Sequence, residues 1–195
     1  MDQKKTPDIS QLTSEQLENE LIRVRYSERY KKLLKNTVYS LLVVAAISVL
    51  IATLFLPVLE IYGNSMSPTL DSKDIVVSVK TADLRQGDIC CLYYNNHILV
   101  KRVIGVPGDV IAMDDDGNVF VNGNLIDEPY LKEKALGECD IEFPFTVPEQ
   151  TLFVLGDNRA TSVDSRNSLI GCISIDEIVG KIVFRIWPLN AFGTV

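Results

Sequence analysis

A run of 23 residues without a charge, residues 37–59, constrains this chain more than any other feature. As a helix that rises about 1.5 Å per residue, the run would span roughly 34 Å, which is enough to cross the ~30 Å hydrocarbon core of a bilayer. A cleavable signal peptide fits poorly, because 36 residues precede the run and no small-x-small site follows it promptly. The run therefore predicts an uncleaved membrane anchor.

The charges on either side of this anchor predict its orientation. Six basic residues crowd the N-terminal side, and the first charge on the other side is Glu60. The six are Arg23, Arg25, Arg29, Lys31, Lys32 and Lys35. The positive-inside rule then predicts a cytoplasmic segment of residues 1–36, an anchor of residues 37–59 and an extracytoplasmic domain of residues 60–195.

The composition of residues 60–195 excludes one class of partner. This part contains 11 basic and 20 acidic residues, which gives a formal charge of −9. Binding to phosphates depends on clustered Lys and Arg, so we expect no nucleic acid partner. The segment before the anchor is predicted to be partly helical, because Thr13 followed by Gln16 resembles a capping box. That helix either contacts lipid head groups or a partner, or is a solvated helix that sets the topology.

After the anchor, the pattern is that of a mostly β protein. Short apolar runs alternate with turns rich in Gly, Pro and Asn, whereas residues 127–150 are irregular. The predicted strands are residues 58–62, 74–80, 88–94, 97–104, 110–113, 118–121, 151–155, 170–175 and 182–187, with a short turn of helix at 176–179. This pattern predicts a barrel-like or coiled-sheet domain behind one N-terminal transmembrane helix.

The cysteines and the histidine predict neither a metal site nor a cofactor. Cys90 and Cys91 are adjacent, Cys139 and Cys172 stand apart, and His97 has no Cys or His close in sequence. Either all four thiols are unpaired, or Cys139 and Cys172 form one bridge.

One corner of the chain is suited to present a serine. Gly63 and Asn64 tolerate unusual backbone angles, and Ser65 follows them directly. Pro68 fixes its own φ and disfavours helix at the residue before it, so we expect an extended chain after Ser65. The alternative is an ordinary surface turn.

A serine nucleophile needs a base, and the chain offers two candidates. His97 is one, but no carboxylate is placed in the sequence to orient it. Lys101 is the other, because it lies in a strand between aliphatic residues. Loss of water can lower a lysine pKa from about 10.4 by several units, toward values at which a neutral amine is available. The alternative for Lys101 is an exposed position on an edge strand.

A third stretch, residues 156–166, follows an apolar strand and is dense in polar groups. It contains two carboxylates and two guanidinium groups, which can form an ion-pair frame within the loop. These are Asp157, Asp164, Arg159 and Arg166. The loop also contains serines that can direct a hydroxyl at a neighbouring group.

Together these stretches resemble the type I signal peptidases, the membrane-anchored Ser/Lys proteases that remove signal peptides. Residues 65–69 fit the S-M-x-P-T motif of that family, and residues 101–109 fit its lysine motif. Residues 156–166 fit its G-D-N-R-x-x-S-x-D-S-R motif, and residues 185–188 its C-terminal signature. The likeness runs from about residue 58 to residue 192, behind a single anchor, as in the compact Gram-positive members.

The resemblance implies a role for each site residue. Ser65 would be the nucleophile, Lys101 the general base and Ser162 the group that orients the lysine. Asp157, Asp164 and Arg166 would form a structural ion-pair network. The backbone N–H of Ser65 would serve the oxyanion hole, but this chain has Gly63 where Gram-negative members have a serine that donates its hydroxyl.

The implied function is cleavage of signal peptides from secreted preproteins at the bacterial cell membrane, with no cofactor. Membrane lipid and the secretion machinery are the expected neighbours. Two rival readings share parts of the pattern. A soluble Ser/Lys repressor-type peptidase lacks the apolar span, and a signal-peptidase-like chaperone for surface pilins lacks the serine or the lysine that this chain retains.

Overall fold

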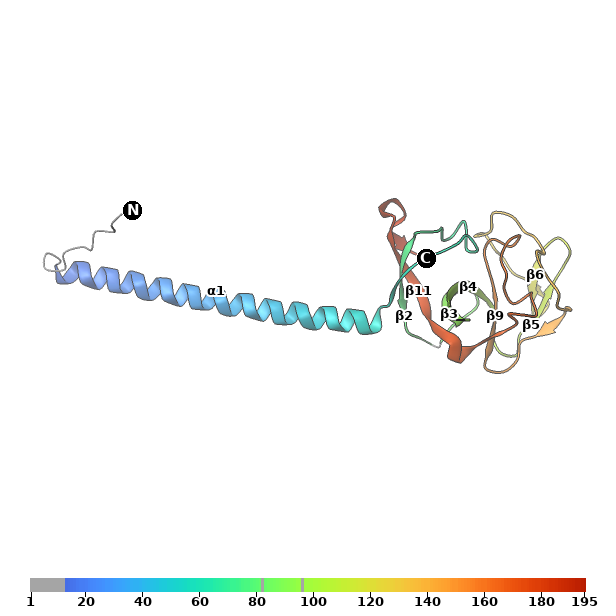
Figure 1. The fold of residues 1–195 in the computed structure, drawn as a ribbon, viewed down its shortest axis with the longest axis horizontal. Coiled ribbons are helices and arrows are strands. Elements are labelled where there is room, and N and C mark those ends of the chain that lie inside the picture. The colour runs from blue at the N-terminus through green and yellow to red at the C-terminus, as the bar shows by residue number, and fades with distance from the viewer. Residues whose placement is uncertain (1–12, 82, 96) are drawn as a thin grey trace. The chain divides into compact units, whose positions relative to one another are not determined.

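The computed structural model describes residues 13–81, 83–95 and 97–195 (Figure 1). The chain divides into two compact units, Met1–Ile51 and Ala52–Val195, and each is described here by itself. Residues 1–12 of the predicted cytoplasmic segment lie outside the described residues.

The first unit consists of helix α1 (Ser14–Phe55), which continues into the second. The backbone N–H of Thr13 donates to Gln16 Oε1 at 3.1 Å, which is half of the predicted capping box. The helix ends at Phe55 and not at Leu59, because Pro57 disfavours helical geometry at Leu56 and cannot donate a backbone hydrogen bond. Within the described part of the chain, α1 is the one helix long and apolar enough to cross a membrane.

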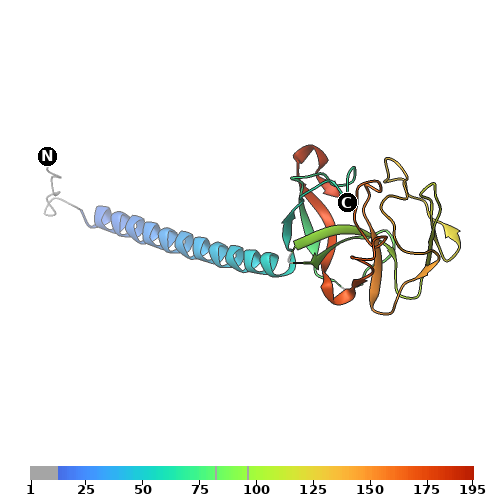
Figure 2. The same ribbon diagram turned by 45° about the vertical axis from the view of Figure 1, so that its right-hand side comes forward.

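The second unit is built mainly on one antiparallel sheet, whose strand order is β1-β2-β11-β3-β4-β9-β10 (Figures 1 and 2). β12 pairs with β11 off this path, and the described strands form no closed barrel. The bounds are β1 (Val58–Glu60), β2 (Ile75–Val79), β3 (Ile89–Tyr94), β4 (His97–Gly105), β9 (Thr151–Leu155), β10 (Ile173–Ser174), β11 (Ile178–Trp187) and β12 (Gly193–Thr194). The predicted mostly β class is confirmed.

A second, smaller sheet packs against the first. Its order is β7-β6-β5-β8, and its strands are β5 (Val110–Met113), β6 (Val119–Val121), β7 (Asn124–Leu125) and β8 (Phe145–Thr146). One hydrophobic core joins the two sheets, because Ile111 and Val119 of the small sheet cluster with Ile104, Phe153 and Leu155 of the large one. This core includes side chains of β4, the strand that carries Lys101, and of β9, the strand that leads into the 156–166 loop.

The long strands lie close to their predicted positions, and residues 151–155 match β9 at both ends. The C-terminal region differs. A short 3-10 helix, η2 (Ile175–Glu177), begins earlier than expected because the Ser174 side chain caps it, so β11 already starts at Ile178. The two-residue strands β7, β8 and β12 carry too little pattern to be predicted.

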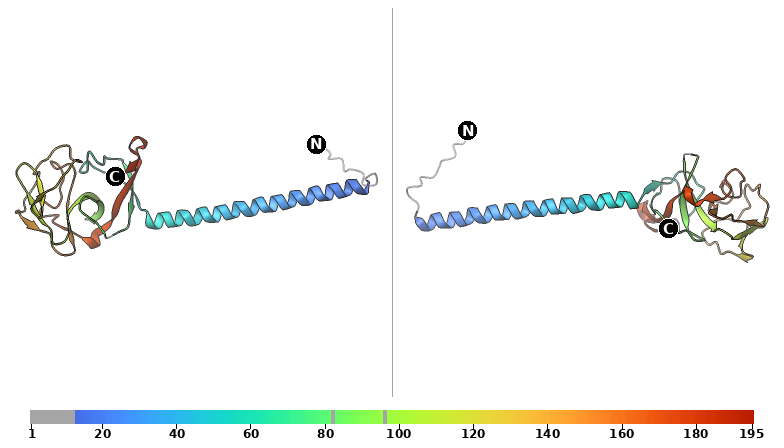
Figure 3. Two further views of the ribbon diagram at one scale, coloured as in Figure 1. Left: turned by 180° about the vertical axis from the view of Figure 1, so that it is seen from behind. Right: turned by 90° about the horizontal axis from the view of Figure 1, so that it is seen from below.

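The relative direction of β1 and β4 follows from the pairing of the strands between them. Each neighbouring pair from β1 through β2, β11 and β3 to β4 is antiparallel, so β1 and β4 run in the same direction. β9 pairs with β4 only from Arg102 onward. Among the described strands, the outer edge of β1 and the outer edge of residues 97–101 have no strand partner. Figure 3 shows the same ribbon from behind and from below.

Candidate active site

Lys101 lies on β4 with its side chain withdrawn from water. The residue is 5% exposed, and its Nζ donates to Ser162 Oγ at 2.9 Å. Burial lowers the pKa of Lys101, whereas Asp164 and Asp157 raise it and Arg166 lowers it further. Burial is the largest of these effects, so the amine is biased toward its neutral form. The alternative of an exposed edge-strand lysine is therefore wrong.

Ser65 lies on a tight turn and not on an extended segment. Ser67 N–H donates to Asn64 O at 3.1 Å, and Leu70 N–H donates to Met66 O at 3.0 Å. These bonds fold the chain back so that Met66 and Leu70 reach the core, where each is at most 2% exposed. The expectation of an extended chain after Ser65 is therefore wrong, because burial of two large apolar side chains favours the turn.

At Gly156, the 156–166 loop lies against the serine corner, the turn of residues 63–70 that contains Ser65. A Cβ at this position would lie 2.5 Å from the Ser65 carbonyl oxygen and would overlap the Ser162 side chain. Asn158 N–H donates to the same Ser65 oxygen at 3.0 Å. Residues far apart in sequence thus meet at a position that only glycine fits without movement.

Asp157 connects the three stretches that resemble the family motifs. Its carboxylate accepts two bonds from the Arg102 guanidinium, at 2.9 and 2.7 Å, and a third from the Thr69 hydroxyl. Thr69 belongs to the serine corner, Arg102 follows Lys101 on β4, and Asp157 follows Gly156. One buried carboxylate therefore fixes the relative positions of all three.

The predicted ion-pair frame within the 156–166 loop is half correct. Arg166 forms a bidentate pair with Asp164, and Asp164 also accepts from Gly156 N–H at 2.9 Å. Asp157 instead pairs with Arg102, and Arg159 pairs with Glu128. Both of these partners lie outside the loop, so the loop sequence alone carried no signal for them.

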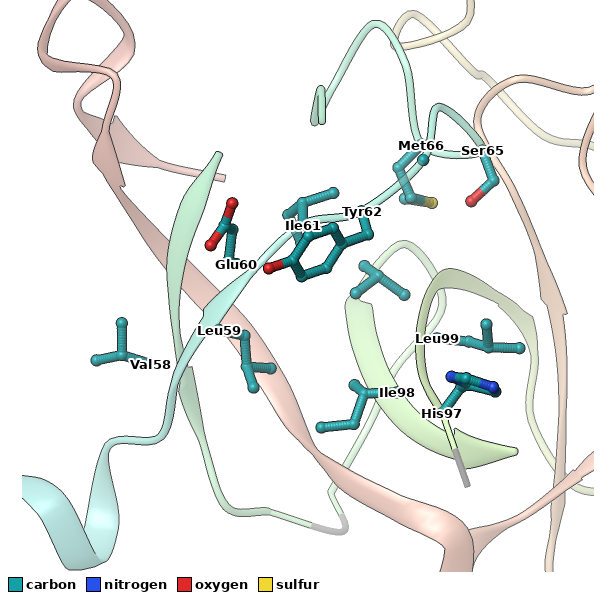
Figure 4. A pocket seen from close by; sticks show the side chains of 12 residues that line it. Val58, Leu59, Glu60, Ile61, Tyr62, Ser65, Met66, His97, Ile98 and Leu99 are labelled. Carbon is teal, nitrogen blue, oxygen red and sulfur yellow. The ribbon is translucent and has the colours of Figure 1, made fainter. Parts of the chain in front are cut away.

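An open pocket of about 550 Å³ lies between β1 and the start of β4. Its lining is mainly aliphatic, and in Figure 4 the side chains of β1 lead along one side toward Met66 and Ser65. Lining residues include Leu59, Ile61, Tyr62, Met66, Ile98 and Leu99. The pocket coincides with the two unpaired strand edges, so its walls offer both apolar contacts and free backbone groups.

The remaining candidates take no part in the Lys101–Ser162 contact. His97 is exposed and lies in the pocket lining. Gly63 has φ +86°, a left-handed conformation that would strain a serine at this position. Cys90, Cys91, Cys139 and Cys172 are all free.

Comparison with known proteins gives one consistent result. Residues 34–187 match the family described as "Signal peptidase, peptidase S26". The chain is similar to signal peptidase I of Bacillus caldolyticus, with 41% identity over 162 residues that cover 73% of this chain and 87% of the relative. It is similar to signal peptidase IB of Staphylococcus aureus (strain Mu50 / ATCC 700699), with 36% identity over 182 residues, 83% of this chain and 94% of the relative.

Among solved structures, a signal peptidase I from Enterococcus faecalis V583 has 30% sequence identity and a TM-score of 0.44, covering 53% of this chain and 98% of that one. The family match spans well over half of the chain, and the curated relatives align along most of their length. This chain therefore belongs to the signal peptidase family, peptidase S26.

Proposed function

We propose that this chain is a membrane-anchored serine endopeptidase that cleaves signal peptides from exported preproteins, with Ser65 as nucleophile and Lys101 as general base. The observation that carries the proposal is the buried Lys101 amine, held by Ser162 in a family whose relatives are named signal peptidase I. A lysine with a lowered pKa is what a serine nucleophile needs in place of a histidine.

In this mechanism, the neutral Lys101 amine accepts the proton of Ser65 Oγ as the oxygen attacks the scissile carbonyl. Lys101 then gives the proton to the leaving amine, and an acyl-enzyme remains on Ser65. A water molecule gives a proton to Lys101 as it attacks the ester. Lys101 then returns this proton to Ser65 Oγ as the bond between Oγ and the acyl carbon breaks, which releases the signal peptide and restores both residues. Ser162 orients the amine throughout, and the backbone N–H of Ser65 donates to the oxyanion.

The substrate lies extended in the pocket between β1 and β4, because both unpaired edges can bond to a peptide strand. Residues 97–101 span about 13 Å at roughly 3.3 Å per residue, so the cleft contacts about five peptide residues. The peptide runs parallel to both strands, so that its signal-peptide part lies toward Val58 and its scissile bond at Ser65. In the sequence, only Leu56 and Pro57 separate the end of α1 from the start of β1 at Val58.

The location follows from the anchor and its flanking charges. Residues 1–36 are the cytoplasmic segment, the apolar run is the single-pass anchor in the cell membrane, and residues 60–195 are the extracytoplasmic catalytic domain of a bacterial, Gram-positive enzyme. Membrane lipid and the secretion machinery are its neighbours. No cofactor takes part in the mechanism.

The test uses the full chain in detergent micelles with a synthetic preprotein. We expect cleavage after a small-x-small segment by the wild type, and no turnover by Ser65→Ala or by Lys101→Arg, whose guanidinium cannot deprotonate. Near-normal cleavage by folded Lys101→Arg would remove lysine as the base. An inactive wild type whose Ser65 does not react with a penem would favour the pilin chaperone instead.

A further inference from the structure

Two buried arginines, Arg102 and Arg159, each hold a different part of the 156–166 loop. Arg102 clamps Asp157 with two bonds. Arg159 donates to the Gly156 carbonyl oxygen at 3.1 Å and pairs with Glu128 in an ion pair whose two side chains are fully buried. Both arginines therefore hold the chain at Gly156 or at its neighbour, where the backbone approaches the Ser65 carbonyl oxygen and the Ser162 side chain closely.

Tyr130 couples these two arginines. The Tyr130 ring lies under the Arg102 guanidinium, and Arg102 Cζ is 3.8 Å from the centroid of this ring. Its hydroxyl donates to Glu128 Oε1 at 2.8 Å. Burial and the Glu128 carboxylate raise the pKa of Tyr130, so the phenol keeps the proton that it donates. Arg102, Tyr130, Glu128 and Arg159 therefore form one continuous chain of contacts, in which Tyr130 is half-buried and the other three are buried.

Glu128 and Tyr130 come from the irregular segment between β7 and β8, where no pattern in the sequence indicates a role for them. Neither residue lines the cleft between β1 and β4. Glu128 is 6% exposed, and an ion pair this deeply buried is costly to desolvate unless its geometry is well satisfied. A buried ion pair is weak evidence for a role in fold stability, because well-packed apolar side chains of similar volume would stabilise the fold equally well.

We propose that Glu128 and Tyr130 are positioning residues of the catalytic reaction, which hold Arg102 and Arg159 so that the 156–166 loop keeps Ser162 against Lys101. This inference rests on the proposed function of Ser65 and Lys101. It assigns to the segment around residues 128–130 a part in catalysis without contact to the substrate.

The electrostatic consequence can be measured at Lys101. Asp157 raises the pKa of Lys101, and Arg102 balances that carboxylate only while it stays in the clamp. The other charged groups that act on Lys101 are Asp164 and Arg166 of the same loop. On β3, Cys90 stands opposite Lys101, and burial raises the pKa of this thiol to about 12, so it stays neutral. Release of Arg102 from Asp157 therefore raises the pKa of Lys101.

The experiment compares Tyr130→Leu, which removes the ring, with Tyr130→Phe, which keeps the ring under Arg102. Assays use the full chain in micelles with a preprotein peptide, and measure kcat and KM from about pH 6 to pH 10. For Tyr130→Leu, we expect kcat to fall about tenfold, equivalent to ~1.4 kcal/mol. We expect KM to change less than about twofold, because Tyr130 does not line the cleft.

The acid limb of the kcat profile should also move to higher pH in Tyr130→Leu, by about half a unit, since a higher lysine pKa leaves less neutral amine at a given pH. Tyr130→Phe keeps the ring under Arg102 but loses the bond from the hydroxyl to Glu128, so both its kcat and its acid limb should lie between those of Tyr130→Leu and the wild type. If Tyr130→Leu does not fold, Tyr130→Met replaces it, because a flexible apolar side chain fills similar space without a ring face.

The control is Phe145→Leu, which weakens the packing of Phe145 against Phe153 in the core between the two sheets. It should lower the thermal midpoint and leave kcat and the acid limb unchanged. A folded Tyr130→Leu variant with wild-type kcat and an unshifted acid limb would overturn the positioning role while leaving the proposed function intact. A wild type without cleavage would instead overturn the proposed function itself.

Discussion

The close approach at Gly156 leads to a sharp prediction for Gly156→Ala. The added Cβ would lie 2.5 Å from the Ser65 carbonyl oxygen, whereas ordinary contact between such atoms begins at about 3.4 Å. The overlap of roughly 0.9 Å must be relieved by movement of the Ser65 turn away from the loop that carries Ser162. A displacement near 1 Å in an active site costs about 100-fold in rate, which corresponds to ~2.7 kcal/mol of transition-state stabilisation.

The assay is the single-turnover rate of preprotein cleavage by the full chain at saturating enzyme, with the wild type measured in parallel. Ala160→Ser is the matched control, because Ala160 is an exposed residue of the same loop and its replacement should leave the rate unchanged. A folded Gly156→Ala variant that cleaves within about threefold of the wild-type rate would show that the spacing of Ser65 and Ser162 does not limit the reaction.

Arg166→Met leaves the Asp164 carboxylate buried without its partner and should lower the free energy of unfolding by about 3–5 kcal/mol, whereas Arg85→Met, at an exposed pair, should leave the denaturation midpoint unchanged. Lys101→Met should abolish cleavage. Burial lowers the pKa of Lys101 in the folded state below its value of about 10.4 in the unfolded state. Between these two pKa values, the unfolded wild type binds a proton that the folded wild type does not bind. The free energy of unfolding of the wild type should therefore increase, relative to that of Lys101→Met, as pH rises through this window. Unfolding midpoints at several pH values check this; an opposite slope would contradict the lowered pKa. Leu99→Trp narrows the cleft and should raise KM about tenfold with a smaller effect on kcat; an unchanged KM would place the substrate elsewhere.

Local patterns in the sequence were sufficient for the features that depend on neighbouring residues. The aliphatic residues around Lys101 predicted a desolvated amine, and the lysine is indeed buried. The end of α1 is a local feature too, since Pro57 sets it, although the length of the apolar run suggested a later end. The strand of residues 151–155 was fixed by its own composition and by the turns on either side.

Features that depend on contacts between distant residues could not be predicted. Asp157 had two arginines within its own loop, yet its partner is Arg102, 55 positions away in the sequence. Glu128 pairs with Arg159 across 31 positions, from a segment whose sequence shows no periodic pattern. The turn after Ser65 was missed because a rule about the residue before proline does not account for the core space available to Met66 and Leu70.

The position of β11 in the sheet has a consequence for the timing of activity during synthesis. β11 pairs with β2 on one side and with β3 on the other, so among the described strands it connects the β1–β2 side of the sheet, next to Ser65, to the β3–β4 side that carries Lys101. Until residues 178–187 have been made, translocated and paired with both β2 and β3, no continuous sheet connects the side that carries Ser65 to the side that carries Lys101. On the proposed assignment of Ser65 and Lys101, such a chain is inactive until β11, the last long strand in the sequence, completes the sheet.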